Sequence, residues 1–169
     1  MIKKTRAFIC GISGHNLKKS EVSFLKKYKP WGIILFSRNI KSINQVQKLT
    51  SSIKKIFKNS NYPILIDEEG GSVSRLRKFI DNSIFSAKYF GDLYSKDRKK
   101  FDIYFNVYVK QISYLLRLIG ININTVPVLD LRRNKSHKII GDRSYSNDKK
   151  TLSKICLLYT SPSPRDWMV

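Results

Sequence analysis

Residues 62–71 read YPILIDEEGG, an apolar run followed at once by three acidic residues and two glycines. A short apolar run bounded by turn-forming residues is typical of a buried strand in a parallel sheet. The carboxyl ends of such strands are where α/β folds bind their ligands. Three consecutive ionisable side chains, Asp67, Glu68 and Glu69, add nothing to an apolar core. They therefore indicate a polar ligand, the alternative being a solvated acidic turn.

Apolar runs and helical periodicities alternate on both sides of this stretch. Strands are expected at residues 7–12, 31–36, 62–66 and 121–129. Helices are expected at residues 20–28, 43–56 and 101–119, the first with Ser20 as its N-cap and the last ended by Gly120. The long helix carries the apolar stripe Phe101, Tyr104, Tyr108, Ile112, Leu115 and Ile119. Because no hairpin signals separate the strands, the alternation predicts an α/β fold with a parallel sheet.

The composition limits the classes of protein without choosing one. The chain has 169 residues, of which 41% are hydrophobic, so it can form one domain with a core. Its net charge of +21 is spread over the whole length as scattered lysine pairs, a pattern that strongly AT-rich coding sequence also produces. Cys10 and Cys156 form neither a metal-binding spacing nor a disulfide framework. No run is long enough to cross a membrane and no signal-peptide cleavage site follows the first apolar run, so a cytoplasmic protein is expected. No metal or cofactor is expected.

The last fourteen residues, CLLYTSPSPRDWMV at 156–169, differ in character from the rest. They show no strand or helix period and lack the Lys, Ile and Asn bias of the preceding chain. The peptide corresponds to one translated frame of a common transposase sequencing adapter. The sequence thus predicts a partial domain at residues 1–155 and a non-biological tail at residues 156–169, the alternative being a natural Ser/Pro-rich tail.

Four motifs follow one another at the ends of the expected strand–helix units. They are GIILFSRN at 32–39, DEEGGSVSR at 67–75, PVLD at 127–130 and IGDRSY at 140–145. Together they resemble the N-terminal half of glycoside hydrolase family 3, with the closest likeness to its bacterial β-N-acetylhexosaminidase branch of cell-wall recycling. The resemblance implies a (β/α)8 TIM-type barrel, of which this chain holds the N-terminal half, about four βα units and incomplete. It also implies removal of a terminal β-linked N-acetylglucosamine with retention of configuration.

The resemblance assigns three sugar-binding residues. Asp67 opens the Asp-x-Glu-Gly-Gly motif, Arg75 follows eight residues later, and Arg143 is the arginine of the Gly-x-Arg-Ser motif. A carboxylate accepts hydrogen bonds from two hydroxyls, and a guanidinium donates in a fixed fork that matches paired oxygens. A surface ion pair for Arg75 and a loop-stapling role for Arg143 are the alternatives. One of Glu68 and Glu69 is expected to support the loop by accepting backbone N–H bonds.

The chain also departs from the family pattern. The family often carries Gln where Glu68 stands and Arg where Ser72 stands, and the loss of that arginine could loosen the loop. Asp130 is expected either to support the ligand-binding residues or to cap a helix. These differences leave the three matched sugar contacts in place.

The chemical groups of the reaction are expected to be missing from this chain. Retaining glycosidases need a nucleophile and an acid/base, and in the resembled enzymes the acid/base histidine follows a Lys-His-Phe-Pro-Gly-His-Gly segment that does not occur here. His15 and His137 lie outside such a context, and His137 reads as a solvated loop residue. We expect no catalytic residue, an inactive fragment, and a carbohydrate partner, either an N-acetylglucosaminyl muropeptide or a chito-oligosaccharide, with no nucleic acid or membrane partner. Another family 3 activity such as β-glucosidase, and a basic nucleic-acid-binding protein, stay open as alternatives.

Overall fold

The computed structural model describes residues 6–132 and 139–160, and these residues form two compact units. The sheet unit comprises residues 6–68, 75–81 and 112–125. The helical unit comprises residues 69–74, 82–111, 126–132 and 139–160. Within the described part of the chain, no helix is both long and apolar enough to span a bilayer.

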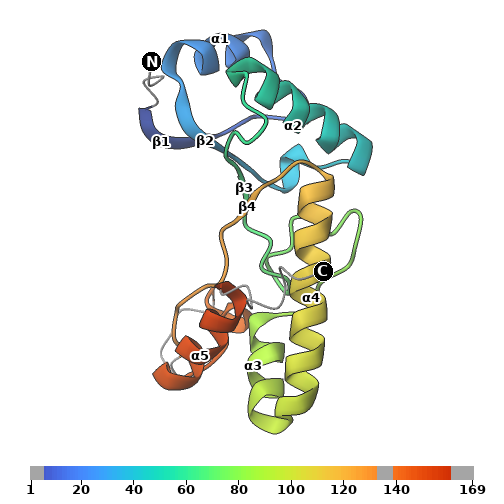
Figure 1. Cartoon of the computed structure of the whole chain (residues 1–169), viewed down its shortest axis with the longest axis vertical. Coiled ribbons are helices and arrows are strands. Elements are labelled where there is room, and N and C mark those ends of the chain that lie inside the picture. The colour runs from blue at the N-terminus through green and yellow to red at the C-terminus, as the bar shows by residue number, and fades with distance from the viewer. Residues whose placement is uncertain (1–5, 133–138, 161–169) are drawn as a thin grey trace. The chain divides into compact units, whose positions relative to one another are not determined.

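Four strands of the sheet unit form one parallel sheet whose order is that of the chain, β1-β2-β3-β4 (Figure 1). The strands are β1 (Arg6–Gly11), β2 (Pro30–Leu35), β3 (Ile64–Ile66) and β4 (Ile123–Asn124). The register places Ile33 beside Ile64 and Leu65 beside Ile123. A doubly wound sheet reverses its strand order, whereas successive strands of a (β/α)8 barrel are neighbours throughout. The predicted α/β class is therefore confirmed, with the strand order of consecutive barrel units.

Helices α1 (Lys19–Tyr28) and α2 (Ile43–Phe57) complete the sheet unit. Helix α2 begins as predicted: the Ser42 side chain accepts a hydrogen bond from the Gln45 amide, and Val46, Leu49 and Ile53 are buried. The expected Ser20 cap of α1 is wrong, because the helix already includes Ser20. Its first turn is held instead by the Glu21 carboxylate, which accepts amide bonds from Lys18 and Ser13. Burial acts to raise the pKa of Glu21, but these hydrogen bonds outweigh burial and lower the pKa.

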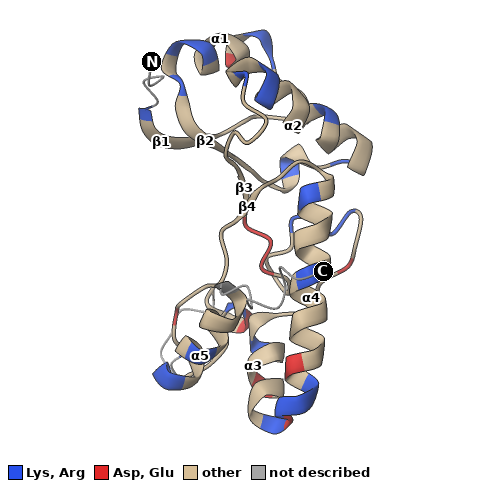
Figure 2. Cartoon of the chain, in the orientation of Figure 1, with Lys and Arg blue, Asp and Glu red and all other residues tan. Residues whose placement is uncertain are grey.

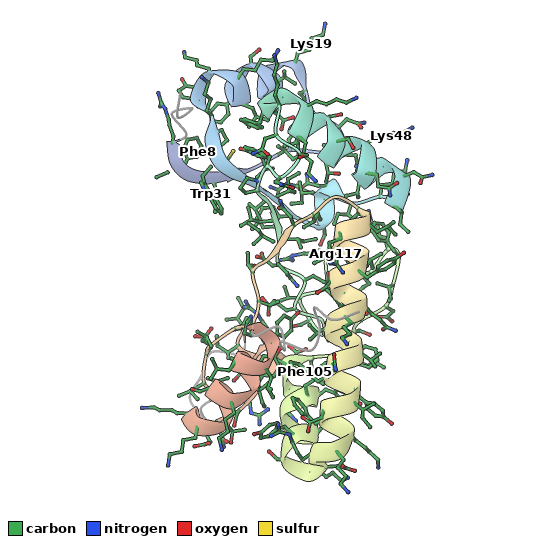
Figure 3. All side chains as sticks on the ribbon, in the orientation of Figure 1. Phe8, Lys19, Trp31, Lys48, Phe105 and Arg117 are labelled. Atoms are coloured by element: carbon green, nitrogen blue, oxygen red, sulfur yellow. The ribbon has the colours of Figure 1, made fainter. Side chains whose placement is uncertain are left out.

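The helical unit is built around aromatic rings. It contains α3 (Ala87–Lys96), α5 (Lys149–Thr160) and residues 98–111 of α4 (Arg98–Leu118). The Phe90 and Phe105 ring centroids lie 5.0 Å apart in an edge-to-face pair, and Phe101 stacks on Phe105 at 4.8 Å. Figure 3 shows Phe105 projecting from α4 toward the packed side of this unit.

Two sequence-based predictions for these helices were wrong. The stretch before residue 101, where no helix was expected, contains α3. On α4, Tyr104 is 48% exposed, and Phe105 and Leu116 are buried where the predicted stripe named Tyr104 and Leu115. The Phe90 ring of α3 packs edge-to-face against Phe105, which covers that side of α4.

Strand β4 is much shorter than the predicted strand at residues 121–129. Only Ile123 and Asn124 pair with β3, after which the Thr125 amide donates to the Ile66 carbonyl. Pro127 has no amide hydrogen to continue the ladder. Asp130 therefore does not close a strand.

Helix α5 extends into the segment predicted to be a tail. Cys156–Thr160 are helical, so the expected absence of helical period was wrong for these five residues. Ile155 and Cys156 are buried, and the Cys156 sulfur lies 4.0 Å from the Val128 carbonyl oxygen, whereas Leu157 is 63% exposed. Burial raises the pKa of the Cys156 thiol to about 11. Residues 161–169 lie outside the described residues, and the non-biological origin of residues 156–169 stays a prediction.

Candidate functional site

The loops that follow β1 and β2 are joined at the carboxyl edge of the sheet by Asn39. This side chain is fully buried, at 0% exposure. Its Nδ2 donates to the carbonyl oxygens of Ile12 at 3.1 Å and Gly14 at 2.9 Å, and its Oδ1 accepts from the Phe36 amide at 2.9 Å. Every polar group of the amide is thus used to fix backbone, which gives the edge a rigid base on which other side chains are displayed.

Asp67 and Arg75, two of the predicted site residues, lie together at this edge. Arg75 NH2 is 3.4 Å from Asp67 Oδ2, and Thr125 Oγ1 donates to Asp67 Oδ1. Both side chains keep about a quarter of their surface exposed, at 27% and 26%. The Arg75 Nε donor is buried and has no partner within the described residues. A long, partly exposed ion pair can exchange its contact for hydrogen bonds to ligand hydroxyls at little expense to the fold.

Glu68 points into the protein and supports the loop, as the sequence predicted for one of the two glutamates. It is 0% exposed, and its Oε2 accepts the amide hydrogens of Arg75 at 2.7 Å and Leu76 at 2.9 Å. The Asn124 side chain forms two hydrogen bonds with the Glu68 backbone: its Oδ1 accepts from the Glu68 amide at 2.9 Å and its Nδ2 donates to the Glu68 carbonyl at 3.0 Å. Glu68 therefore fixes the backbone from which the Arg75 side chain extends.

Arg143, the third predicted residue, belongs to the helical unit and forms a bidentate pair there. Its Nε and NH2 each lie 2.8 Å from a Glu69 carboxylate oxygen, and the Glu69 side chain is only 9% exposed. This is the loop-stapling geometry that the sequence left open as the alternative for Arg143. A direct sugar contact by Arg143 stays a prediction.

A second connection joins the same two loops of the helical unit. The Ser72 amide donates to Asp142 Oδ2 at 2.9 Å, and the Ser72 hydroxyl donates to Asp142 Oδ1 at 2.5 Å. Gly71 has φ +58°, and a Cβ placed there would lie 2.4 Å from Asp142 Oδ2, so glycine is needed for this approach. The loop that was expected to be loosened by Ser72 is held by two hydrogen bonds to one carboxylate.

Asp130, another sequence-based candidate, contributes its backbone and not its carboxylate to the contacts of the described residues. The Asp130 carboxylate is exposed, and it is the Asp130 carbonyl that receives the Ser144 hydroxyl at 2.6 Å. His137 lies outside the described residues. Within residues 6–132 and 139–160, no group of three His, Cys, Asp or Glu side chains could hold a metal ion.

In the helical unit, burial above all holds the pKa of Tyr145 well above its ordinary value, so Tyr145 remains a neutral phenol.

Sequence reasoning missed Asn39, Asn124 and Thr125, which organise the edge. Asn39 closes the GIILFSRN motif, and Asn124 and Thr125 come immediately after the strand partner of Leu65. For Asn39 the available signal was a polar residue shortly after an apolar strand, whereas Asn124 and Thr125 fell inside the strand predicted at 121–129 and gave no such signal.

The fold and the site define a class: an α/β protein with barrel-type strand order that presents a carboxylate and a guanidinium at the carboxyl edge of its sheet. The family described as the glycosyl hydrolase family 3 N terminal domain matches residues 3–161. The chain belongs to this family, as the four sequence motifs indicated.

Individual relatives agree with the family. The chain is 28% identical over 151 residues to a beta-hexosaminidase of Xanthomonas campestris, covering 89% of this chain and 44% of that protein. Among solved structures, it is similar to NagZ from Neisseria gonorrhoeae in complex with N-trifluoroacetyl-D-glucosamine, with a TM-score of 0.81 and 25% identity over 92% of this chain and 46% of the other. A family 3 beta-N-acetylglucosaminidase from Paenibacillus gives a TM-score of 0.70 and 26% identity over 90% and 28% of the two chains. The chain spans less than half the length of each of these relatives.

Proposed function

We propose that this chain is the N-terminal part of a retaining β-N-acetylhexosaminidase that removes terminal N-acetylglucosamine. Family membership and the beta-hexosaminidase and beta-N-acetylglucosaminidase relatives support the proposal. The NagZ relative was solved with a derivative of glucosamine bound, which supports an N-acylated amino sugar as the ligand.

The observation that carries the proposal is the long, partly exposed Asp67–Arg75 pair at the carboxyl edge of the sheet. In the proposed complex, Asp67 accepts hydrogen bonds from sugar hydroxyls and Arg75 donates to ring substituents. Each charge-assisted hydrogen bond of this kind contributes about 1.5–3 kcal/mol when water is excluded. Arg143 is proposed as a third contact, held in position by its bidentate pair with Glu69.

We further propose that the reaction itself is outside the capacity of residues 1–169. Retention requires a nucleophile and an acid/base, usually two carboxylates about 5–5.5 Å apart. Glu68 is committed to two amide hydrogens and Glu69 to Arg143. The chain supplies sugar contacts, and hydrolysis of 4-nitrophenyl N-acetyl-β-glucosaminide by the purified chain is expected to stay at the buffer rate. Turnover by the chain would overturn this part of the proposal.

The proposed biological substrate is a peptidoglycan fragment processed in the cytoplasm, with a chito-oligosaccharide as the second possibility. A β-glucosidase is the alternative within the family. A nucleic-acid-binding protein is less well supported, because Lys and Arg occur on each of helices α1 to α5 (Figure 2) instead of lining one of them with stacking aromatics.

Sugar binding can be tested with N-trifluoroacetyl-D-glucosamine, whose fluorine signal broadens or shifts on binding even when the affinity is millimolar. The wild-type chain is expected to broaden the signal, and excess N-acetylglucosamine to reverse the broadening, whereas excess glucose does not. Asp67→Asn should weaken binding about tenfold or more. Asp102→Asn is the matched control, because Asp102 is a half-exposed carboxylate paired with Arg98 on α4.

Two outcomes would contradict the proposal. If glucose competes as well as N-acetylglucosamine, the β-glucosidase alternative is favoured. If Asp67→Asn and Asp102→Asn bind like wild type, the Asp67–Arg75 pair is not the sugar site.

The proposed non-biological tail is tested on the source DNA. If residues 156–169 come from the adapter, the source DNA does not encode them, and sequencing it from codon 156 onward is expected to give a sequence other than the adapter. A natural coding sequence for these fourteen residues would refute that origin.

A further inference from the structure

Thr125 follows strand β4 directly, and it lies beside the end of β3, where Asp67 begins its loop (Figure 1). The register pairs Asn124 with Ile66, and the Thr125 amide donates to the Ile66 carbonyl at 2.9 Å. The Thr125 hydroxyl donates to Asp67 Oδ1. All four residues belong to the sheet unit. The proposed function uses Asp67 and leaves Thr125 without a role.

The single proton of the Thr125 hydroxyl has two acceptors within reach. Thr125 Oγ1 lies 3.3 Å from the Ile66 carbonyl oxygen and closer to Asp67 Oδ1. The Ile66 carbonyl already accepts the Thr125 amide, whereas Asp67 Oδ1 has no other hydrogen bond within residues 6–132 and 139–160. A hydrogen bond to an ionised acceptor is also stronger than one to a neutral carbonyl. The proton therefore belongs to the Asp67 carboxylate.

The hydroxyl that holds Asp67 is itself held in place. Threonine is branched at Cβ and has few side-chain conformations. The neighbouring Asn124 side chain binds the Glu68 amide and carbonyl at 2.9 and 3.0 Å. The end of β4 thus fixes the backbone on both sides of Asp67, through Ile66 and Glu68. The Thr125 hydroxyl adds a contact that reaches the Asp67 side chain itself.

This contact keeps the Asp67–Arg75 pair long. With Oδ1 held by Thr125, only Oδ2 faces Arg75, at 3.4 Å from its NH2. Without the hydroxyl, the carboxylate is free to turn about its side-chain bonds and to present both oxygens to the guanidinium fork. Glu69 and Arg143 form such a bidentate pair, with both contacts at 2.8 Å. A ligand hydroxyl displaces a single long contact more easily than a bidentate pair.

We propose that Thr125 is a positioning residue of the sugar site: its hydroxyl holds Asp67 Oδ1 and leaves Oδ2 directed at the ligand. A side chain that is fixed in its bound conformation before the ligand arrives loses less freedom on binding. This inference rests on the proposed function and deepens it, because it names a residue that acts on the ligand through Asp67.

Two variants of Thr125 test the hydroxyl. Thr125→Val removes it and keeps the branched shape, and it should weaken binding of N-trifluoroacetyl-D-glucosamine about three- to tenfold. Thr125→Ser keeps the hydroxyl and should restore most of the affinity. The urea midpoint of Thr125→Val should match that of wild type, because the bond to Asp67 is exposed and water replaces it.

A measurement without ligand and a control variant complete the test. The carboxyl-carbon NMR signal of Asp67 should shift in Thr125→Val and stay near its wild-type position in Thr125→Ser. Thr151→Val is the matched control, because Thr151 of the helical unit also hydrogen-bonds an aspartate, Asp148. It should change neither the Asp67 signal nor the binding of the probe.

The outcomes separate this inference from the proposed function. If Asp67→Asn weakens binding and Thr125→Val does not, the positioning role is wrong and the proposed function stands. Equal weakening by Thr125→Val and Thr125→Ser would show that the hydroxyl is not the cause. A lower urea midpoint with unchanged binding would make Thr125 a structural residue only. Failure of the wild-type chain to bind the probe would overturn both proposals.

Discussion

Removal of the Glu68 carboxylate is expected to destabilise the loop at residues 67–75 strongly. Glu68 is fully buried and accepts two amide hydrogens, from Arg75 at 2.7 Å and from Leu76 at 2.9 Å. In Glu68→Ala both amides lose their acceptor. A buried donor left without a partner costs about 1–3 kcal/mol, so the two together cost about 2–6 kcal/mol. Glu68→Gln should be much milder, because the amide oxygen can accept both hydrogens.

A second glutamate provides the control. Glu21 also accepts two amide hydrogens, from Ser13 at 2.7 Å and from Lys18 at 2.8 Å, but these groups are exposed to water. Water replaces the lost acceptor in Glu21→Ala, so the expected loss is about 1 kcal/mol. The pair of variants thus separates burial from the number of hydrogen bonds.

The assay is urea unfolding of each variant together with amide hydrogen exchange at Arg75 and Leu76. A loss of 2 kcal/mol or more corresponds to exchange about thirtyfold faster at these two amides. The Glu68→Ala variant should also bind N-trifluoroacetyl-D-glucosamine more weakly, because the backbone that carries the Arg75 side chain is no longer fixed. If Glu21→Ala is as destabilising as Glu68→Ala, or if exchange at Leu76 is unchanged, the supporting role given to Glu68 is wrong.

Three further predictions concern the two units separately. Gly91→Ala places a Cβ 1.6 Å from the Tyr145 carbonyl oxygen and should destabilise the helical unit by about 1–3 kcal/mol in urea unfolding. In the control Gly14→Ala the added Cβ has nothing within 4 Å, and stability should change by less than about 0.5 kcal/mol. Iodoacetamide at pH 8 should label Cys10 before Cys156, because Cys156 is buried and burial raises its pKa to about 11, whereas Cys10 is partly exposed, although burial and Glu21 raise its pKa as well. Equal labelling rates in the folded protein would contradict the packing of α5. The lowered pKa of Glu21 adds stability that is fully present above pH 4.5 and is lost as the pH falls through the lower folded-state pKa. The Glu21→Gln variant should therefore lose less stability than wild type as the pH is lowered. An unchanged pH dependence of stability at acid pH would exclude this contribution.

Continuous apolar runs were enough to predict the sheet, and apolar residues at helical spacing were enough to predict helix α2. In residues 31–36 and 62–66 a run of Ile and Leu is bounded by Pro and polar residues, which is typical of a buried strand, and Ile33, Leu35 and Ile64 are fully buried. The end of β4 could not be predicted in this way. Residues 121–129 are apolar enough for a strand throughout, and it is the missing amide of Pro127 and the position of β3 that limit pairing to two residues.

The roles of the site residues were only partly predictable for a similar reason. That one glutamate would support the loop followed from its chemistry, but which one depends on the direction of the chain after β3. Arg143 could be a sugar contact or a staple as far as its motif shows, and its partner Glu69 is 74 residues away in the chain. The local sequence predicts which kind of interaction each residue makes, whereas tertiary packing determines which partner it makes it with.

The three consecutive carboxylates that open the site show how one short motif supports different tasks. Glu68 is fully buried and fixes amides, and Glu69, at 9% side-chain exposure, is held by the fork of Arg143. Asp67 keeps 26% of its side chain exposed and makes only a 3.4 Å contact with Arg75, beside the short bond from Thr125. The first acid is therefore the one that a ligand can still reach, while the second and third hold the backbone and the loop. This division agrees with the proposed sugar site: two of the three carboxylates are held by groups of the protein, and Asp67 is the one left for the proposed ligand.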